Sequence, residues 1–283
     1  MADSKLKIIP LGGLEQIGMN ITAFEYEDSI IVVDCGLSFP EDDMLGIDLV
    51  IPDITYLKEN IEKVKGFFIT HGHEDHIGAI PYVLKEINVP IYATKLTVGI
   101  IEHKLREHDL MRVVKRKIVK YGQHINLGCF RVEFIKTNHS IQDAAALAIY
   151  SPAGVVIHTG DFKVDYTPVF GDAIDLQRFG EIGKKGVLAL MCDSTNAERS
   201  GFTMSEKTVG KVLDSIFTDH KNNRIIVSTF ASNVDRVQQI INCAYNHGRK
   251  VVIEGRSMVN IISTATELGY INIPEHTLID IEQ

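Results

Sequence analysis

Residues 69–81 read ITHGHEDHIGAIP, and this stretch decides how the rest of the chain is interpreted. It continues a short, mostly apolar run, FFIT at residues 67–70, which has the composition of a buried strand. Three histidines, a glutamate and an aspartate then fall within six positions, 71–76. Such groups crowded beside an apolar strand would repel one another or lose their hydration unless a cation held them. The stretch therefore predicts a metal site at the end of a strand.

The spacing within HGHEDH indicates two adjacent ions rather than one. His71 and His73 are alternate residues of an extended segment, so both rings can face the same side, and Gly72 permits an unusual backbone angle between them. Asp75 and His76 follow at the expected start of a helix and turn toward a neighbouring position. Imidazole and carboxylate ligands favour zinc or manganese over calcium.

Further candidate ligands stand where other predicted strands end. His139 follows FRVEFIKTN, Asp161 follows VVIHTG, and Asp34 ends IIVVD. Layered α/β folds gather their site residues at such positions. Taken singly, each has a plainer interpretation, a hydrogen-bonded histidine at a strand end or an aspartate in a turn. The HGHEDH cluster is what makes a shared metal site the stronger interpretation.

The composition is that of a folded protein, with 45% hydrophobic and 23% charged residues among 283, enough for one large domain or two. No apolar run approaches a membrane span, and MADSKLKIIPLGG shows no secretory signal. The four cysteines are far apart, which favours reduced thiols and a cytoplasmic location. The net charge of −8 taken alone argues against a polyanionic partner, because nucleic-acid binders usually carry a basic surface.

The order of predicted strands and helices changes near residue 200. Before it we expect helices at 77–87 and 95–108, and many short strands, at 5–9, 21–26, 30–33, 65–70, 91–93, 117–120, 130–136, 144–150, 155–158 and 187–191. After it, the capping box TMSE at 203–206 predicts a helix that ends near His220.

Helices at 233–246, stopped by Gly248, and at 257–268 then alternate with strands at 224–228 and 250–254. This alternation implies a parallel sheet. We expect one domain over residues 1–205 and the first part of another over 206–283.

The order of these motifs resembles the metallo-β-lactamase superfamily. H-x-H-x-D-H follows one strand, a strand-end histidine comes next, and a Gly-Asp pair follows a later strand. The resemblance implies an αββα sandwich with two metal ions along one edge of its two sheets. It also implies that Asp34 supports the ligands without binding an ion. The implied ligands are His71, His73 and His139 for one ion, Asp75 and His76 for the other, and Asp161 for both.

Longer stretches narrow the resemblance to the ribonuclease J family of bacteria, among the β-CASP nucleases. They are LGGLEQIGMN, TGDFKVD, MCDSTNAERSG, STFASNVDRVQQII and EGRSM. In this group a second α/β domain with a parallel sheet is inserted into the metallo-β-lactamase domain. The resemblance implies a metal-dependent ribonuclease that cuts RNA internally and from its 5′ end during RNA processing and decay. The implied cofactors are two divalent ions, zinc in the first place, with manganese or magnesium as alternatives.

The same resemblance implies site residues and partners. Asp193, in LALMCDSTN, matches an acidic residue that helps to protonate the leaving group, and Asp75 is a second candidate for proton transfer. Lys163, Arg236 and Arg256 are candidate RNA contacts, although a solvated surface position is the more usual role of such residues. The implied substrate is single-stranded RNA with a 5′-monophosphate. Family members form homodimers and homotetramers, an association expected to be weakened here.

One departure from the family pattern matters. Ribonuclease J has a histidine-rich phosphate-binding motif, a final metal-binding histidine and closing sandwich elements, and none has a counterpart before Gln283. We therefore expect an N-terminal portion that lacks full activity. Two alternatives stay open. A small-molecule hydrolase, such as a thioesterase or lactonase, would be favoured if His220 were a ligand and no second domain existed. A non-catalytic RNA-binding or scaffold subunit would be favoured if the chain bound no metal.

Overall fold

The computed structural model describes residues 4–281, which form two compact units. The first comprises Met1–Thr137, Asp143–Phe162 and Asp175–Glu198, and the second comprises Asn138–Gln142, Lys163–Ile174 and Arg199–Gln283. No helix within residues 4–281 is long and apolar enough to cross a membrane. The domain boundary between residues 205 and 206 stays a prediction.

The first unit contains a six-stranded sheet in the order β1-β2-β3-β4-β5-β6. Its strands are β1 (Lys7–Gly12), β2 (Ile21–Tyr26), β3 (Ser29–Val33), β4 (Val64–Phe68), β5 (Ile91–Ala93) and β6 (Arg116–Ile118). The first three strands pair antiparallel, and β3 to β6 pair parallel. Every residue of β3 is buried, as expected of a near-continuous apolar run covered on both faces.

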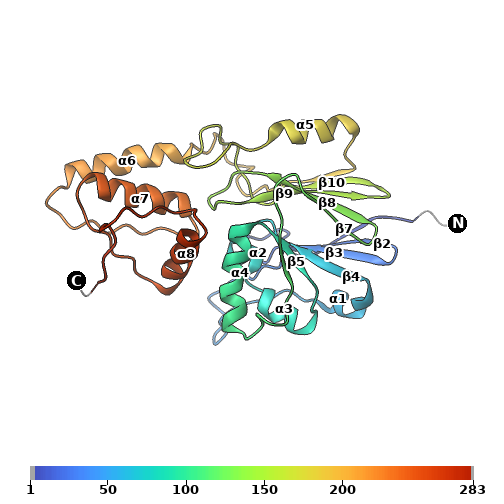
Figure 1. The fold of residues 1–283 in the computed structure, drawn as a ribbon. Coiled ribbons are helices and arrows are strands. Elements are labelled where there is room, and N and C mark those ends of the chain that lie inside the picture. Colours follow the sequence, from blue (N-terminus) through green and yellow to red (C-terminus); the bar gives the residue numbers. More distant parts are fainter. Residues whose placement is uncertain (1–3, 282–283) are drawn as a thin grey trace. The chain divides into compact units, whose positions relative to one another are not determined.

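A five-stranded sheet in the order β11-β10-β9-β8-β7 faces the first (Figure 1). Its strands are β7 (His124–Leu127), β8 (Phe130–Lys136), β9 (Ala145–Ser151), β10 (Gly154–His158) and β11 (Ala189–Met191). β8 and β10 both run antiparallel to β9, and β11 runs parallel to β10. The carboxyl ends of β8, β10 and β11 therefore lie at the same edge of the sheet.

The core of the first unit lies between these sheets. Phe68 of the first sheet stacks on Tyr92 at 5.1 Å between ring centroids and meets Phe134 of the second sheet at 6.1 Å. The helices are α1 (Thr55–Glu59), α2 (Glu74–Ile77), α3 (Ile80–Glu86), α4 (Lys95–Glu107) and α5 (Leu176–Lys185), with a 3₁₀ turn at Ile61–Lys63. In Figure 1, α1, α3 and α4 lie outside the first sheet and α5 outside the second. This confirms the expected αββα sandwich.

Helix α5 was not expected from the sequence. It reads LQRFGEIGKK, and its two glycines lower intrinsic helix propensity. Tertiary packing compensates, because Ile182 is buried with Ala146 and Ile157 of the second sheet. Asp175 also caps the first turn by accepting a hydrogen bond from the Arg178 amide at 3.0 Å.

The second unit carries three helices, α6 (Glu206–Asp219), α7 (Val234–Asn246) and α8 (Arg256–Glu267), close to the predicted ranges. The capping box at Thr203 was wrong. Ser205 caps α6 by accepting from the Lys207 amide at 3.3 Å, and Asp165 accepts from the Glu206 amide at 3.3 Å. Gly248, at a φ of 63°, follows the end of α7 as predicted.

The strands predicted at 224–228 and 250–254 were wrong, because the structure has no strand over these residues. A single parallel bridge joins Val251 to Leu278, with the Ile279 amide donating to the Val251 carbonyl at 3.0 Å. Apolar composition identifies a candidate strand, but a strand forms only beside a neighbour that completes its hydrogen bonds. Ile226 and Phe230 are instead 89% and 83% exposed.

A buried ion pair joins α5 to the second sheet. Glu133 of β8 is 2% exposed and accepts hydrogen bonds from Arg178 Nε at 2.7 Å, Arg178 Nη2 at 2.9 Å and the Tyr150 hydroxyl at 3.1 Å. Burial by itself raises the pKa of Glu133, but the bonds and charge of Arg178 outweigh it and hold the pKa below its ordinary value. The carboxylate is therefore more stable in the folded chain than in the unfolded one.

We predict that Glu133→Gln lowers the free energy of unfolding at pH 7 by about 1–3 kcal/mol, because a charge-assisted pair is lost. Since the folded pKa is depressed, this contribution is present above the ordinary value of 4.5 and is lost as pH falls through the folded pKa. Urea unfolding of both proteins at pH 7 and near pH 4 should show the gap narrowing. Glu181→Gln, at an exposed partner of Arg178, is the matched control. A gap independent of pH would contradict the assignment.

Candidate metal centre

The sandwich brings the predicted site residues of both sheets to one edge. His71 follows β4, Asp161 follows β10, and Asp34 follows β3, which is the parallel neighbour of β4. At this edge the two sheets are joined by the Ala145 amide, which donates to the Thr70 carbonyl at 2.9 Å. Strand direction and this bond together place carboxyl-terminal strand ends of both sheets side by side.

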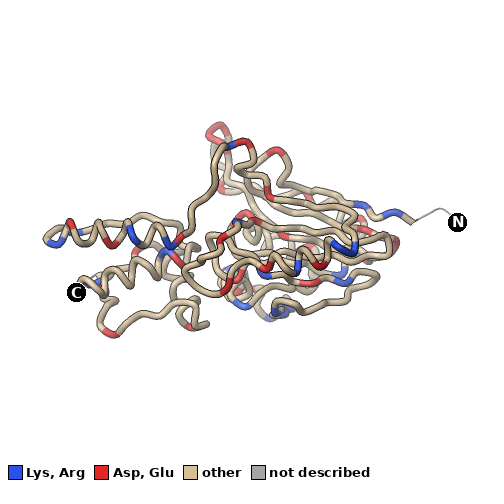
Figure 2. Tube along the Cα trace, turned by 90° about the horizontal axis from the view of Figure 1, so that it is seen from above, with Lys and Arg blue, Asp and Glu red and all other residues tan. Residues whose placement is uncertain are grey.

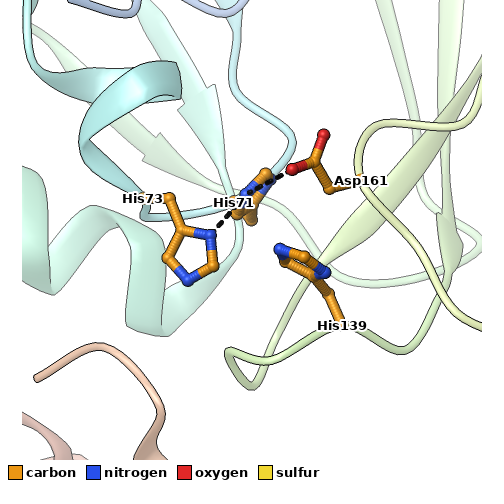
Figure 3. A group of neighbouring side chains, drawn as sticks. All are labelled: His71, His73, His139 and Asp161. Atoms are coloured by element: carbon orange, nitrogen blue, oxygen red, sulfur yellow. Dashed lines mark hydrogen bonds and ion pairs between the residues drawn. The ribbon is translucent and has the colours of Figure 1, made fainter. Parts of the chain in front are cut away.

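One group of side chains consists of His71, His73, His139 and Asp161, whose candidate ligand atoms all lie within 4.8 Å of one another. His71 Nε2 is 3.1 Å from His73 Nδ1 and 4.0 Å from Asp161 Oδ2. Figure 3 shows the three rings and the carboxylate turned toward a common space. Four nitrogen and oxygen donors at this spacing fit the donor set of a zinc or manganese site.

A second group consists of Asp75, His76 and Asp161, again with ligand atoms within 4.8 Å of one another. His76 Nε2 is 3.4 Å from Asp75 Oδ2 and 3.4 Å from Asp161 Oδ1. Asp161 thus turns Oδ2 toward the first group and Oδ1 toward the second. One carboxylate shared in this way is suited to bridging two cations.

A buried carboxylate sets the orientation of the histidines. Asp34 is 1% exposed, and its Oδ2 lies 2.8 Å from His76 Nδ1. The Thr70 amide donates to Asp34 Oδ1 at 2.7 Å, and the Thr70 hydroxyl lies 2.9 Å from Asp34 Oδ2 and 3.0 Å from His71 Nδ1. Because the Nδ1 atoms of both rings are engaged, their Nε2 atoms are left to face the groups described above.

The electrostatics of the second group suit a cation. Burial by itself would lower the pKa of His76, but the surrounding carboxylates of Asp34, Asp161 and Asp75 raise it well above its ordinary value. Burial of Asp75 would raise its pKa, but the hydrogen bond and charge of His76 lower it. Three carboxylates around one imidazole leave an excess of negative charge, which a metal cation would neutralise.

The loop that carries His139 is closed at its base. The Thr137 amide donates to the Ala144 carbonyl at 3.3 Å. Asp143, at a φ of 66°, accepts the Leu96 amide of α4 on Oδ2 at 3.0 Å and the Thr94 hydroxyl on its own carbonyl at 2.7 Å. The chain therefore leaves β8 and returns to β9 through fixed points on either side of His139.

The remaining predicted site residues lie outside both groups. Asp193 Oδ1 accepts from the Thr195 amide at 2.9 Å and from its hydroxyl at 2.7 Å, as in an Asx turn. Lys163 pairs with Asp165 at 3.6 Å, and Arg236 donates to both carboxylate oxygens of Glu206 at 2.7 and 2.9 Å. Arg256 begins α8 and is exposed.

One residue at the site was missed by the sequence analysis. The Asn20 side-chain nitrogen lies 3.2 Å from Asp75 Oδ2 and 3.1 Å from His76 Nε2. A polar residue directly before the buried strand β2 was the available signal, but nothing in the local sequence connects it to a helix more than fifty residues later.

Comparison with known proteins agrees with this architecture. The model of the metallo-beta-lactamase superfamily matches residues 18–180, and the model described as ribonuclease J, beta-CASP domain, matches residues 222–283. A protein of unknown function from Enterococcus faecalis V583 has the same fold, with a TM-score of 0.70 and 18% identity over 98% of this chain and 74% of its own.

Curated relatives are closer in sequence. Ribonuclease J of Synechocystis is 49% identical over 98% of this chain and 43% of its own length. Ribonuclease J 1 of Streptococcus pyogenes is 47% identical over 98% of this chain and 49% of its own length. The chain thus spans less than half the length of these two relatives. The chain belongs to the metallo-β-lactamase superfamily and, within it, to the ribonuclease J family.

Proposed function

We propose that this chain forms the metal-binding part of a ribonuclease that hydrolyses RNA phosphodiester bonds with two divalent ions. The observation that carries the proposal is Asp161, which turns one oxygen to each of two groups of nitrogen and oxygen donors. The relatives named ribonuclease J support RNA as the substrate class.

In this proposal His71, His73 and His139 hold one ion, Asp75 and His76 hold the other, and Asp161 contacts both. Zinc is the inferred metal, with manganese or magnesium as alternatives, because the donors combine imidazoles and carboxylates. Two such ions, when bound, lower the pKa of a water and offset charge on the scissile phosphate. Asp34 and Thr70 keep the histidine rings oriented throughout.

The proton transfers are assigned to carboxylates of this chain. Asp75 is the candidate to accept the proton of the attacking water, since its side chain is partly exposed beside His76. Asp193 is the candidate to protonate the departing ribose 3′ oxygen, with its second oxygen available while Oδ1 holds the Thr195 turn. Bond breaking at phosphorus then needs no covalent intermediate with the protein.

The inferred substrate is single-stranded RNA with a 5′-monophosphate, cut both internally and from the 5′ end. Figure 2 shows basic residues interspersed with acidic ones along the chain, so charge alone does not identify the RNA path. Lys163 and Arg236 already have carboxylate partners, which leaves Arg256 as the more accessible of the three candidate contacts. A cytoplasmic location and assembly into homodimers or homotetramers belong to the same proposal.

A small-molecule hydrolase is the second candidate, and the position of His220 argues against it. His220 is the C-terminal cap of α6, and its backbone carbonyl accepts a hydrogen bond from Arg249. It belongs to neither candidate metal group among the described residues. A thioesterase or lactonase would be favoured by His220 among the candidate ligands, and His220 is in neither group.

We predict that Asp161→Asn reduces bound metal from two equivalents to at most one, because the amide cannot neutralise two cations at once. Elemental analysis after equilibrium dialysis against zinc measures this directly. Asp53→Asn, in an exposed turn of the same unit, should retain both equivalents. Two equivalents in the Asp161 variant would rule out a bridging role.

We predict that Asp34→Asn weakens metal binding about 10–100-fold although Asp34 is not itself a ligand. An asparagine NH₂ facing His76 Nδ1 would favour the tautomer with its proton on Nε2, the nitrogen needed by the ion. Competition with a chelator gives the affinity, and Asp165→Asn is the control, another buried aspartate. An unchanged affinity in the Asp34 variant would contradict the orienting role.

The substrate is tested with a chimaera of residues 1–283 joined to the remaining part of the Synechocystis ribonuclease J. It should cut 5′-monophosphorylated single-stranded RNA and leave a thioester intact. His76→Ala should slow cleavage by at least about 100-fold, since ligands matter no less than their supports, whereas His108→Ala, at the end of α4, should not. Thioester turnover without RNA cleavage would favour the small-molecule alternative.

A further inference from the structure

Asn20 lies beside Asp75 and His76 but has no role in the proposed function. Its side-chain nitrogen lies 3.1 Å from the Asp75 carbonyl, 3.2 Å from Asp75 Oδ2 and 3.1 Å from His76 Nε2. The two Asp75 oxygens can only accept hydrogen bonds here, so they require the NH₂ end of the amide to face them. Asn20 therefore contacts both residues that belong to the second group alone.

The place of Asn20 is fixed by its backbone. Its amide donates to the Asp75 carbonyl at 2.9 Å, and its carbonyl accepts from the Gly36 amide at 2.9 Å. Gly36 is needed for this approach, since a Cβ there would lie 1.6 Å from the Asp75 carbonyl oxygen and 2.8 Å from the Asn20 nitrogen. The side chain is thus held by main-chain contacts with both neighbouring segments.

The other end of the amide is also confined. A Cβ at Gly13 would lie 2.7 Å from Asn20 Oδ1, so the amide oxygen packs against the backbone of the preceding loop. With its oxygen against this loop and its nitrogen on Asp75, the amide is in contact at both ends. Asp75 is partly exposed, and its helix α2 is only four residues long. Within this helix His76 Nε2 lies 3.4 Å from Asp75 Oδ2, and Asn20 adds a contact to the same oxygen from outside the helix.

We propose that Asn20 is a positioning residue, whose amide fixes the Asp75 carboxylate beside His76 and thereby sets the affinity of the chain for the second ion. This rests on the proposed two-metal site. The hydrogen bonds of the Asn20 side chain go to Asp75 and His76, which belong to the second group and not to the first. A selective effect on one of two ions is what separates this role from general support of the fold.

The test is a zinc titration of the chain and of Asn20→Ala, with chelator competition for affinity and elemental analysis for stoichiometry. Asn20→Ala should weaken the second equivalent about 10–100-fold and leave the first unchanged. Asn60→Ala is the matched control, a half-buried asparagine of the same unit whose NH₂ donates to the Tyr56 carbonyl at 2.9 Å. Unchanged binding of both ions, or equal weakening of both, would overturn the proposal.

A measurement on the unaltered chain covers the case in which Asn20→Ala does not fold. With asparagine labelled by ¹⁵N, the Asn20 side-chain NH₂ signals should shift on addition of the second zinc equivalent and not of the first. Signals that follow the first equivalent, or neither, would overturn the assignment. If the unaltered chain binds fewer than two equivalents, the proposed two-metal site fails, a result distinct from failure of the role of Asn20.

Discussion

The rest of the site depends on the hydrogen bonds of one buried carboxylate, that of Asp34. A charge with 1% exposure is costly unless hydrogen bonds replace its hydration, and here the Thr70 amide, the Thr70 hydroxyl and His76 Nδ1 do so. These partners come from the segment after β4 and from α2. One carboxylate at the end of β3 therefore ties together the backbone that presents His71 and the helix that presents His76.

At the same edge the second sheet comes close to the first at Gly160. Gly160 has a φ of 56°, and a Cβ there would lie 2.9 Å from Thr70 Cβ. The residue that turns the chain into Asp161 thus touches the residue that holds Asp34. A side chain at Gly160 would push the two sheets apart and move the Asp161 carboxylate away from the histidines. The position of Asp161 beside His71 and His76 therefore depends on the close approach of Gly160 to Thr70.

Much of this edge could be predicted from the sequence, because it follows from local pattern and strand direction. The apolar runs before Asp34, His71, His139 and Asp161 identified strands, and within each sheet the carboxyl ends of strands that run the same way lie at the same edge. Asn20 could not be found in this way, since its backbone and side-chain contacts with Asp75 join residues fifty-five positions apart in the sequence. Helix α5 was missed for a related reason, because its stability comes from packing on the second sheet rather than from its glycine-containing sequence.

In the second unit the helices could be predicted from the sequence and the strands could not. Hydrogen bonds within a helix are local, so the sequences of α6, α7 and α8 were enough to predict them. A strand depends on a neighbour that can lie anywhere in the chain, and residues 224–228 have the composition of a strand without a ladder to join. The sequence pattern therefore indicates which residues prefer an extended, buried conformation. Whether they form a strand depends on a neighbouring strand that completes their backbone hydrogen bonds, and that neighbour is set by the whole fold. The edge that carries the candidate metal ligands was predictable because its strands have their neighbours within the first unit, where apolar pattern and pairing agree.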